Sequence, residues 1–487
     1  MELQGVSYRV DTVEHYVAGP AMKYSRLAVS SDDNTFGASV LEINMNAANR
    51  PMIKVEVGHD SINTTEAISE LAMRKSDSIR RYVAAMNGDF FITSSFAATH
   101  PLGKRILGFP NVTSATGGRI ISPDAIDYPN REKCFILTDD GNMYIDATDI
   151  SVSIIDRSGQ SILLTQINYP RTDNDIILYN SFFGRHTKTD STGLEIILEP
   201  ATGKNNTINR PMKYRVVQPL AYSGNSKIPA DGAIISIGRN RIKDTPGLTQ
   251  LKPGDEITVN INLSLPAHDN LKPENISEII GGDVRVLNQG RTTKAGDPDA
   301  LRFINSATMK YQRSLVGFSK DCSELVFCSV DNGIGGGGVS YYDAGDLMRE
   351  LGCYDALDLD GGGSTAMYLR TPGIVNHLRD GAERAVGNGL FAVVEAPEDN
   401  KISTIRFADH AIRVAKSTEY RPIFYGYNSH DELISMNVEG VHLSAPSELG
   451  CVTPDGTLMV TGQGAHPLTA TYNGSTATII VTIDNDI

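Results

Sequence analysis

Short apolar segments separated by Gly, Asn, Asp and Pro run through most of the 487-residue chain. Alternation of apolar and polar residues between such turn residues is typical of short β-strands. Segments of this kind include RYVAAM, KCFILT, DIILYN, LEIILEP, GAIISIG and EITVNINLSL. Few segments show helical spacing. The pattern therefore predicts an α+β fold, with a strand-rich domain of mixed sheets and a few helices.

A first helix is predicted in NTTEAISELAMRKS, residues 63–76. Asn63 and Glu66 have the spacing of a capping box, in which each side chain bonds a free backbone N–H group at the start of a helix. Ile68, Leu71 and Ala72 share one face at helical spacing. We expect this face to pack on the core.

A second helix is predicted in YYDAGDLMRELG, residues 341–352. Ala344, Leu347, Met348 and Leu351 recur at the spacing of one helical face. Gly352 follows at the position where a helix commonly ends in a left-handed residue. We expect the helix to end there.

A domain boundary is predicted near EAPEDNKIS, residues 395–403, because the segment is charged, contains proline and follows an apolar strand. The length of the chain favours two or three domains. Residues 398–487 contain short strands at close spacing, which predicts an all-β sandwich. Residues 61–397 form the main domain, and residues 1–60 are a β-rich segment that we expect to pack on it.

Composition excludes several classes of protein. The net charge of -14 disfavours nucleic acid as a partner, since phosphates require a basic surface. The five cysteines form no C-x-x-C pair, which disfavours a zinc site, and their odd, scattered arrangement disfavours a disulfide framework. No apolar run is long enough to predict a transmembrane segment, and the N-terminal sequence MELQGVSYRV lacks the pattern of a signal peptide.

The segment DALDLDGGGS places Asp358 and Asp360 at the end of an apolar strand, directly before three glycines. Glycine lets a ligand approach the main chain closely, and a strand-end acid beside bare N–H groups suits a small polar or anionic ligand. A tight turn with a solvated Asp explains the stretch equally well. The segment alone leaves both interpretations open.

A second glycine-rich segment, DNGIGGGGVS, contains the G-x-G-x-x-G spacing at Gly333, Gly335 and Gly338. It follows an apolar strand and precedes the predicted helix 341–352, which is the order of a dinucleotide-binding site. A doubly wound sheet requires alternating strands and helices, whereas the rest of the chain is strand-rich. A dinucleotide-binding oxidoreductase is therefore the less favoured alternative.

A third segment, AAMNGDFF, breaks a strand at Asn87-Gly88, which by itself predicts only a hairpin turn. Together with RSLVGF, DALDLDGGGSTAMYL and RDGAERAVGNGLFAVV, in this order, it resembles the phosphodiester glycosidase family. The resemblance covers roughly residues 60–395. Residues 398–487 are similar to a bacterial immunoglobulin-like module. The resemblance implies a secreted or envelope-associated bacterial hydrolase that acts on a glycosyl phosphodiester.

The resemblance also implies roles for individual residues. Cleavage of a glycosyl bond normally requires two carboxyl groups, and Arg binds a phosphate bidentately. Asp360 and Glu195 are the expected catalytic carboxylates. The expected substrate-binding residues are Arg313 and Arg384 on the phosphate, together with Asn87, Asp89, Gly361, Gly362, Gly363, Ser364 and Asn388. Asp89 is equally well explained as a turn residue, and Asp283 and Asp331 are lesser candidates.

No cofactor is claimed. A divalent cation is possible because Asp331, Asp358 and Asp360 are oxygen donors, but no dense ligand pattern supports one. The expected partner is a sugar-phosphate or glycan, and the expected location is periplasmic, secreted or at the cell surface, with any envelope attachment outside this sequence. A non-catalytic glycan-binding surface protein, which keeps the pocket but lacks a pair of acids, remains the main alternative.

Overall fold

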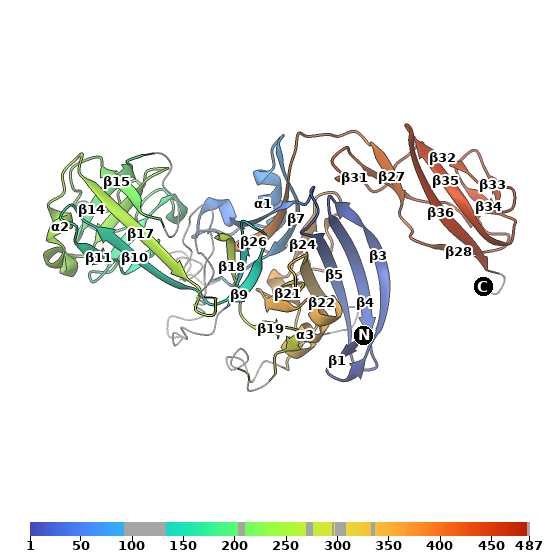
Figure 1. Cartoon of the computed structure of the whole chain (residues 1–487), viewed down its shortest axis with the longest axis horizontal. Coiled ribbons are helices and arrows are strands. Elements are labelled where there is room, and N and C mark those ends of the chain that lie inside the picture. Colours follow the sequence, from blue (N-terminus) through green and yellow to red (C-terminus); the bar gives the residue numbers. More distant parts are fainter. Residues whose placement is uncertain are drawn as a thin grey trace.

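The computed structural model describes residues 1–91, 133–202, 210–268, 276–294, 297, 308–332 and 337–484. The molecule is elongated (Figure 1), with an eight-stranded sheet at one end, packed sheets in the centre and C-terminal sheets at the other end. The strand-rich architecture with few helices confirms the predicted fold class. None of the helices in the described part of the chain is long and apolar enough to cross a membrane.

The largest central sheet contains eight strands, and all of its neighbouring strands pair antiparallel. In spatial order they are β20 (Arg291–Thr292), β19 (Arg285–Asn288), β23 (Asp355–Asp358), β21 (Arg313–Phe318), β22 (Glu324–Asn332), β5 (Thr35–Asn44), β4 (Met22–Ser30) and β3 (Arg9–Gly19). A small hairpin, β1 (Glu2–Leu3) and β2 (Val6–Ser7), precedes it. The antiparallel pairing does not fit the doubly wound parallel sheet of a dinucleotide-binding domain. Gly333 and Gly335 lie outside the described residues.

A five-stranded antiparallel sheet packs against the first one. Its strands are β25 (Gly373–Ile374), β24 (Met367–Leu369), β7 (Arg80–Asn87), β26 (Asn388–Glu395) and β6 (Met52–Val57). A three-stranded sheet of β18 (Ile276–Gly281), β8 (Cys134–Thr138) and β9 (Met143–Asp146) contributes to the same core. The first sixty residues thus supply strands to both central sheets.

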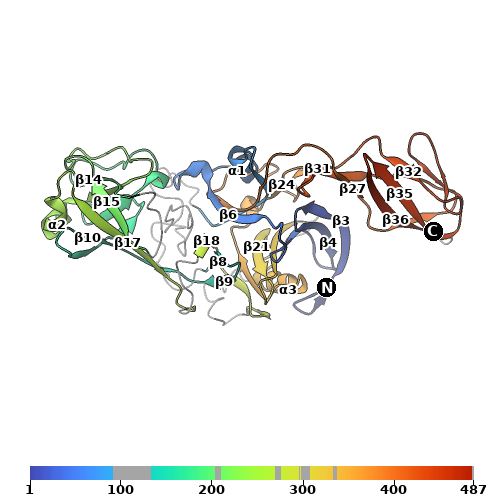
Figure 2. The same ribbon diagram turned by 45° about the horizontal axis from the view of Figure 1, so that its top comes forward.

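Within the predicted main domain, an eight-stranded sheet encloses a separate hydrophobic core. Its strands are β11 (Ser161–Leu163), β10 (Asp149–Ile155), β17 (Glu256–Ser264), β15 (Met212–Val216), β14 (Leu194–Pro200), β16 (Ala233–Ile237), β13 (Ile176–Tyr179) and β12 (Gln166–Ile167). The short helix α2 (Pro246–Thr249) accompanies it. In both views this sheet occupies the end of the molecule opposite to the C-terminal strands (Figure 2).

Helix α1 (Ile68–Lys75) buries Ile68, Leu71 and Ala72, as predicted. The predicted capping box is wrong, because the N-cap is Ala67 and no side chain caps the helix. The side chain of Glu66 instead accepts hydrogen bonds from Arg74, whose Nε lies 2.7 Å away. The ion pair with Arg74, in the last turn of the helix, engages the carboxylate that a capping box at the first turn would require.

Helix α3 (Tyr341–Glu350) buries Ala344, Leu347 and Met348 against the large central sheet, as predicted. Gly352 follows with φ +86°, a left-handed conformation that suits glycine at a helix end. The sequence analysis missed the N-terminal cap, in which Ser340 and Asp343 form a reciprocal capping box.

The C-terminal residues form three further sheets. The first sheet contains β27 (Thr404–Phe407), β30 (Phe424–Tyr427) and β31 (Leu433–Ser435). The second contains β28 (Ile412–Ala415), β36 (Ser475–Asp484), β35 (Gly464–Tyr472) and β32 (His442–Ser444). The third contains β29 (Glu419–Tyr420), β34 (Leu458–Val460) and β33 (Gly450–Val452). Tyr427 and Leu433 are buried in the core of the central sheets. An ion pair between Arg81 on β7 and Glu432 also joins the two parts.

Candidate active site

The glycine-rich turn that follows β23 is held by the backbone of two neighbouring segments. The N–H group of Asp360 donates to the carbonyl oxygen of Gly88 (2.9 Å), and the N–H group of Gly362 donates to the carbonyl oxygen of Gln312 (2.9 Å). A Cβ atom at Gly361 would lie 2.6 Å from that carbonyl oxygen of Gln312, so only glycine fits there. Gly362 has φ +62°, which also favours glycine.

Asn87, at the end of β7, ties this turn to its surroundings. Its Nδ2 donates to the carbonyl oxygen of Asp360 (2.7 Å), and its Oδ1 accepts from Oγ of Ser314 (2.6 Å) and the N–H group of Ala366 (3.1 Å). The side chain is fully buried. Asn87 therefore joins three segments at one end of the two packed sheets, and these contacts position the backbone of Asp360.

Asn388, at the start of β26, has a similar structural contact. Its Oδ1 accepts a hydrogen bond from the N–H group of Asp89 (2.7 Å), and its carbonyl oxygen accepts from the N–H group of Gly88 (3.0 Å). Oδ1 of Asp89 accepts from the N–H group of Phe90 (2.7 Å). Asn388 and Asp89 thus fix the Asn87-Gly88 break, and both side chains are buried.

A cluster of carboxylates, which we call the acid cluster, lies where β23 ends, and its members are Asp283, Asp358 and Asp360. Asp283 and Asp358 are buried, and Asp360 is half-buried. Nη1 of Arg313 lies 3.4 Å from Oδ2 of Asp358, and the hydroxyl of Tyr341 donates to Oδ2 of Asp283 (3.4 Å). The pKa of Asp358 is raised to about 7: burial is the largest cause, Arg313 opposes it, and the charges of Asp283 and Asp360 add to it.

Arg313 is buried against Asp358 of the acid cluster and is not exposed on the surface of the turn. Its side chain is only 5% exposed, and its guanidinium stacks on the ring of Tyr341, 3.7 Å from the centroid. Nε donates to the carbonyl oxygen of Val339 (3.0 Å), and Nη2 donates to that of Met309 (3.4 Å). These contacts and the ion pair with Asp358 occupy all three guanidinium nitrogens.

Arg384, by contrast, is an exposed cation on the glycine-rich turn. Its Nη1 donates to Oγ of Ser364 (3.4 Å), and its Nη2 pairs with Oδ2 of Asp380 (2.5 Å). A Cβ atom at Gly363 would lie 1.9 Å from Nη2 of Arg384, so the guanidinium lies directly over this glycine. Its side chain is 40% exposed, which leaves it accessible to an anion.

Among known protein families, residues 214–393 match the one described as Phosphodiester glycosidase. The chain contains a phosphodiester glycosidase family domain. The matched range includes Asp283, Arg313, Asp358, Asp360 and Arg384, and thus the acid cluster with both arginines. Among curated proteins, no sequence matches the chain.

At least two solved structures share the fold of most of this chain. A hypothetical protein from Synechocystis has a TM-score of 0.55 at 18% identity over 77% of this chain, which spans 62% of that protein. A protein from Burkholderia pseudomallei K96243, described as exported, has a TM-score of 0.57 at 14% identity over 80% of this chain and 98% of its own. Zebrafish N-acetylglucosamine-1-phosphodiester alpha-N-acetylglucosaminidase, as a catalytic domain auto-inhibited by its pro-peptide, has a TM-score of 0.34 at 12% identity over 80% of this chain and 88% of its own, too low to support an argument.

The structure does not bring Glu195 to the glycine-rich turn of the phosphodiester glycosidase domain. Glu195 lies on β14, in the sheet at the far end of the molecule, whereas β21 lies in the centre in both views (Figures 1 and 2). Its carboxylate accepts hydrogen bonds from Oγ1 of Thr189 (2.7 Å), Oγ of Ser236 (3.2 Å) and the N–H group of Ser226 (3.0 Å). Burial raises the pKa of Glu195, but these hydrogen bonds outweigh burial and lower it overall.

The remaining acid named from the sequence, Asp331, serves another contact. Its carboxylate pairs with Nη1 of Arg26 (2.8 Å) and accepts from the N–H group of His377 (2.6 Å). In the described part of the chain, no three His, Cys, Asp or Glu side chains are arranged to hold a metal ion. The sequence analysis gave no role to Tyr341 or Gln312, because neither stands in a segment with a local functional signal.

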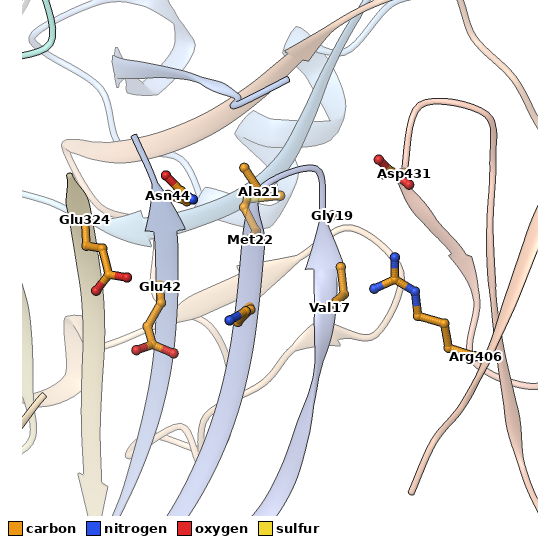
Figure 3. A pocket seen from close by; sticks show the side chains of 10 residues that line it. Val17, Gly19, Ala21, Met22, Glu42, Asn44, Glu324, Arg406 and Asp431 are labelled. Atoms are coloured by element: carbon orange, nitrogen blue, oxygen red, sulfur yellow. The ribbon is translucent and has the colours of Figure 1, made fainter. Parts of the chain in front are cut away.

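A pocket of about 270 Å³ lies elsewhere, between the central sheet and the C-terminal strands (Figure 3). Glu42 and Glu324 extend from one wall, and Arg406 and Asp431 extend from the other. Burial raises the pKa of Glu42, and the neighbouring charge of Glu324 raises it further. None of the residues expected to bind substrate lines this pocket.

Proposed function

We propose that this protein hydrolyses a glycosyl phosphodiester bond, separating a sugar from a phosphate ester in a glycan or wall-type polymer. The observation that supports this best is that a half-buried carboxylate, Asp360, begins the glycine-rich turn, and an exposed guanidinium, Arg384, lies over Gly363 of the same turn. A carboxylate suits the reacting sugar carbon, and a guanidinium suits the phosphate. The turn lies inside the phosphodiester glycosidase domain.

In this proposal Arg384 binds the phosphate, with help from Ser364 and the turn. The N–H groups of Gly361 and Gly363 make no hydrogen bond to any described residue, so both remain available to phosphate oxygens. A phosphate ester leaves more easily than an alcohol, which reduces the need for a strong general acid. The main requirement is then charge stabilisation on the leaving group.

Asp360 acts on the anomeric carbon, either directly or through a water molecule. Asn87 holds the backbone of Asp360, and Arg313 holds Asp358 beside it. These two residues therefore serve as positioning residues. Asp358 interacts electrostatically with Asp360 and with Asp283, so the acid cluster supplies a second carboxyl group better than the distant Glu195 does.

The substrate class also suggests where the protein works. Glycan and wall polymers lie outside the cytoplasm, and the Burkholderia pseudomallei protein with the same fold is described as exported. We infer a periplasmic, secreted or surface location. Fractionation of the native host, with a cytoplasmic enzyme as the marker for leakage, tests this inference.

The decisive experiment is a screen of α- and β-glycosyl phosphodiesters beside plain aryl glycosides, with the product anomer read by NMR. Asp360→Asn is expected to lower turnover by about 10²-fold or more, as the loss of a catalytic group usually does. Asp139→Asn, on the exposed turn after β8, is the matched control. Binding of substrate with no turnover in the unmodified protein would instead favour a glycan-binding function.

A further inference from the structure

The acid cluster brings three carboxyl groups together, two of them buried. At the end of β23, Arg313 pairs with Asp358, and the charges of Asp283 and Asp360 act on the same carboxyl group. A backbone hydrogen bond holds Asp283 next to Asp358, because the N–H group of Asp283 donates to the carbonyl oxygen of Asp358 (2.8 Å). A buried charge without a partner is costly, and such a group takes up a proton instead.

Asp358 is the member with the least compensation for a negative charge. Its side chain is only 1% exposed, and its Oδ1 has no hydrogen-bond partner among the described residues. Its Oδ2 has one long contact with Arg313, at 3.4 Å. A carboxylate accepts several hydrogen bonds when ionised, so this environment suits the neutral acid better.

Among the described residues, the charged and titratable groups that act on Asp358 come from several elements. Arg313 approaches from β21, Asp283 from the connection between β18 and β19, and Tyr341 from α3; Asp360 follows Asp358 on the turn after β23. Two of these four groups are acids whose charge disfavours ionisation of Asp358. The direction agrees with the raised pKa of Asp358, about 7.

We propose that Asp358 is a positioning residue that remains protonated when the enzyme works, so that Asp360 alone carries the catalytic charge. The inference rests on the proposed function for its effect on turnover, but not for its protonation state. Two neighbouring carboxyl groups with different protonation divide the roles of neutral group and charged group in this way. Loss of the proton from Asp358 places a second buried charge beside Asp360 and disturbs its position.

The proposal predicts the pH dependence of activity. With the unmodified protein, turnover of a glycosyl phosphodiester falls as the pH rises through about 7, because Asp358 then loses its proton. In Asp358→Asn the side chain has the shape of the neutral acid but cannot lose a proton, so the fall in turnover occurs at a higher pH. Asp358→Ala lowers turnover at every pH, and Asn at this position rescues it relative to Ala.

A second measurement is independent of catalysis. At pH 6 the infrared carbonyl band of protonated carboxyl groups is stronger in the unmodified protein than in Asp358→Asn; Glu278, whose pKa is also raised to about 7, mainly by burial, contributes the same intensity to both spectra. Asp139→Asn retains the full intensity of the band. Thermal melts add a third readout. Because the pKa of Asp358 is higher in the folded than in the unfolded protein, the stability that its protonation provides is lost as the pH rises from about 4 to 7. Over this range the melting temperature of Asp358→Asn therefore rises relative to that of the unmodified protein.

The outcomes separate the two proposals. A carbonyl band of unchanged intensity in Asp358→Asn, or a folded Asp358→Asn protein that loses as much turnover as Asp360→Asn, overturns the neutral role of Asp358. Absence of turnover in the unmodified protein overturns the proposed function instead. The infrared and thermal results then still decide whether Asp358 is protonated.

Discussion

The ion pair of Arg81 and Glu432 provides the sharpest test of how the C-terminal strands are attached. The Arg81 and Glu432 side chains are 3% and 4% exposed. Nε of Arg81 lies 2.7 and 3.0 Å from the two carboxylate oxygens of Glu432, and Nη1 donates to the carbonyl oxygen of Ala396. Removing one charge of such a pair leaves the other buried without compensation.

Glu432→Gln is therefore expected to destabilise the protein by about 3–5 kcal/mol, the usual cost of breaking a buried ion pair. Glu398→Gln, at an exposed acid of the same junction, is the control and is expected to change stability by less than about 0.5 kcal/mol. The double variant Arg81→Met/Glu432→Leu is expected to recover most of the loss, because well-packed apolar residues replace such pairs at little cost.

Urea denaturation followed by far-ultraviolet circular dichroism measures these differences, since the chain contains no tryptophan to report on unfolding. A protein with several cores can unfold in more than one transition, so each transition is compared between variants. A loss below about 1 kcal/mol for Glu432→Gln, which is the value of an exposed pair, would refute the argument that this ion pair is shielded from water.

Three further predictions follow from local geometry. Gly363→Ala places a methyl group on the guanidinium of Arg384, so inhibition of turnover by inorganic phosphate should weaken several-fold while the melting temperature changes little; unchanged inhibition contradicts the phosphate site. Glu195→Gln should destabilise its sheet by about 1–3 kcal/mol at pH 7 through lost hydrogen bonds, with a smaller difference below the ordinary Glu pKa of about 4.3 because the lowered pKa loses its benefit there. A selective loss of turnover by folded Glu195→Gln would restore its catalytic role. Truncation after residue 397 exposes the core that Tyr427 covers, so residues 1–397 should melt lower than the full chain, and an unchanged melt would show that the contact is dispensable.

Local signals in the sequence predicted much of the secondary structure. The buried faces of α1 and α3, the helix end at Gly352 and the strand that ends at Asp358 all follow from spacing within about fifteen residues. The capping box at Asn63 failed because the carboxylate of Glu66 found a stronger partner in Arg74. The glycine requirement at the turn after Asp360 was also visible in the sequence.

The composition of the candidate site depended on tertiary structure. Glu195 and Arg313 both stand in strands, and alternation fixes only that successive side chains point to opposite faces. The pairing of distant strands places Glu195 in a separate sheet and turns Arg313 inward onto Asp358. The same long-range pairing brings Asp283 to Asp358 and Arg81 to Glu432. No segment of the sequence contains both partners of these contacts, so only the folded chain could reveal them.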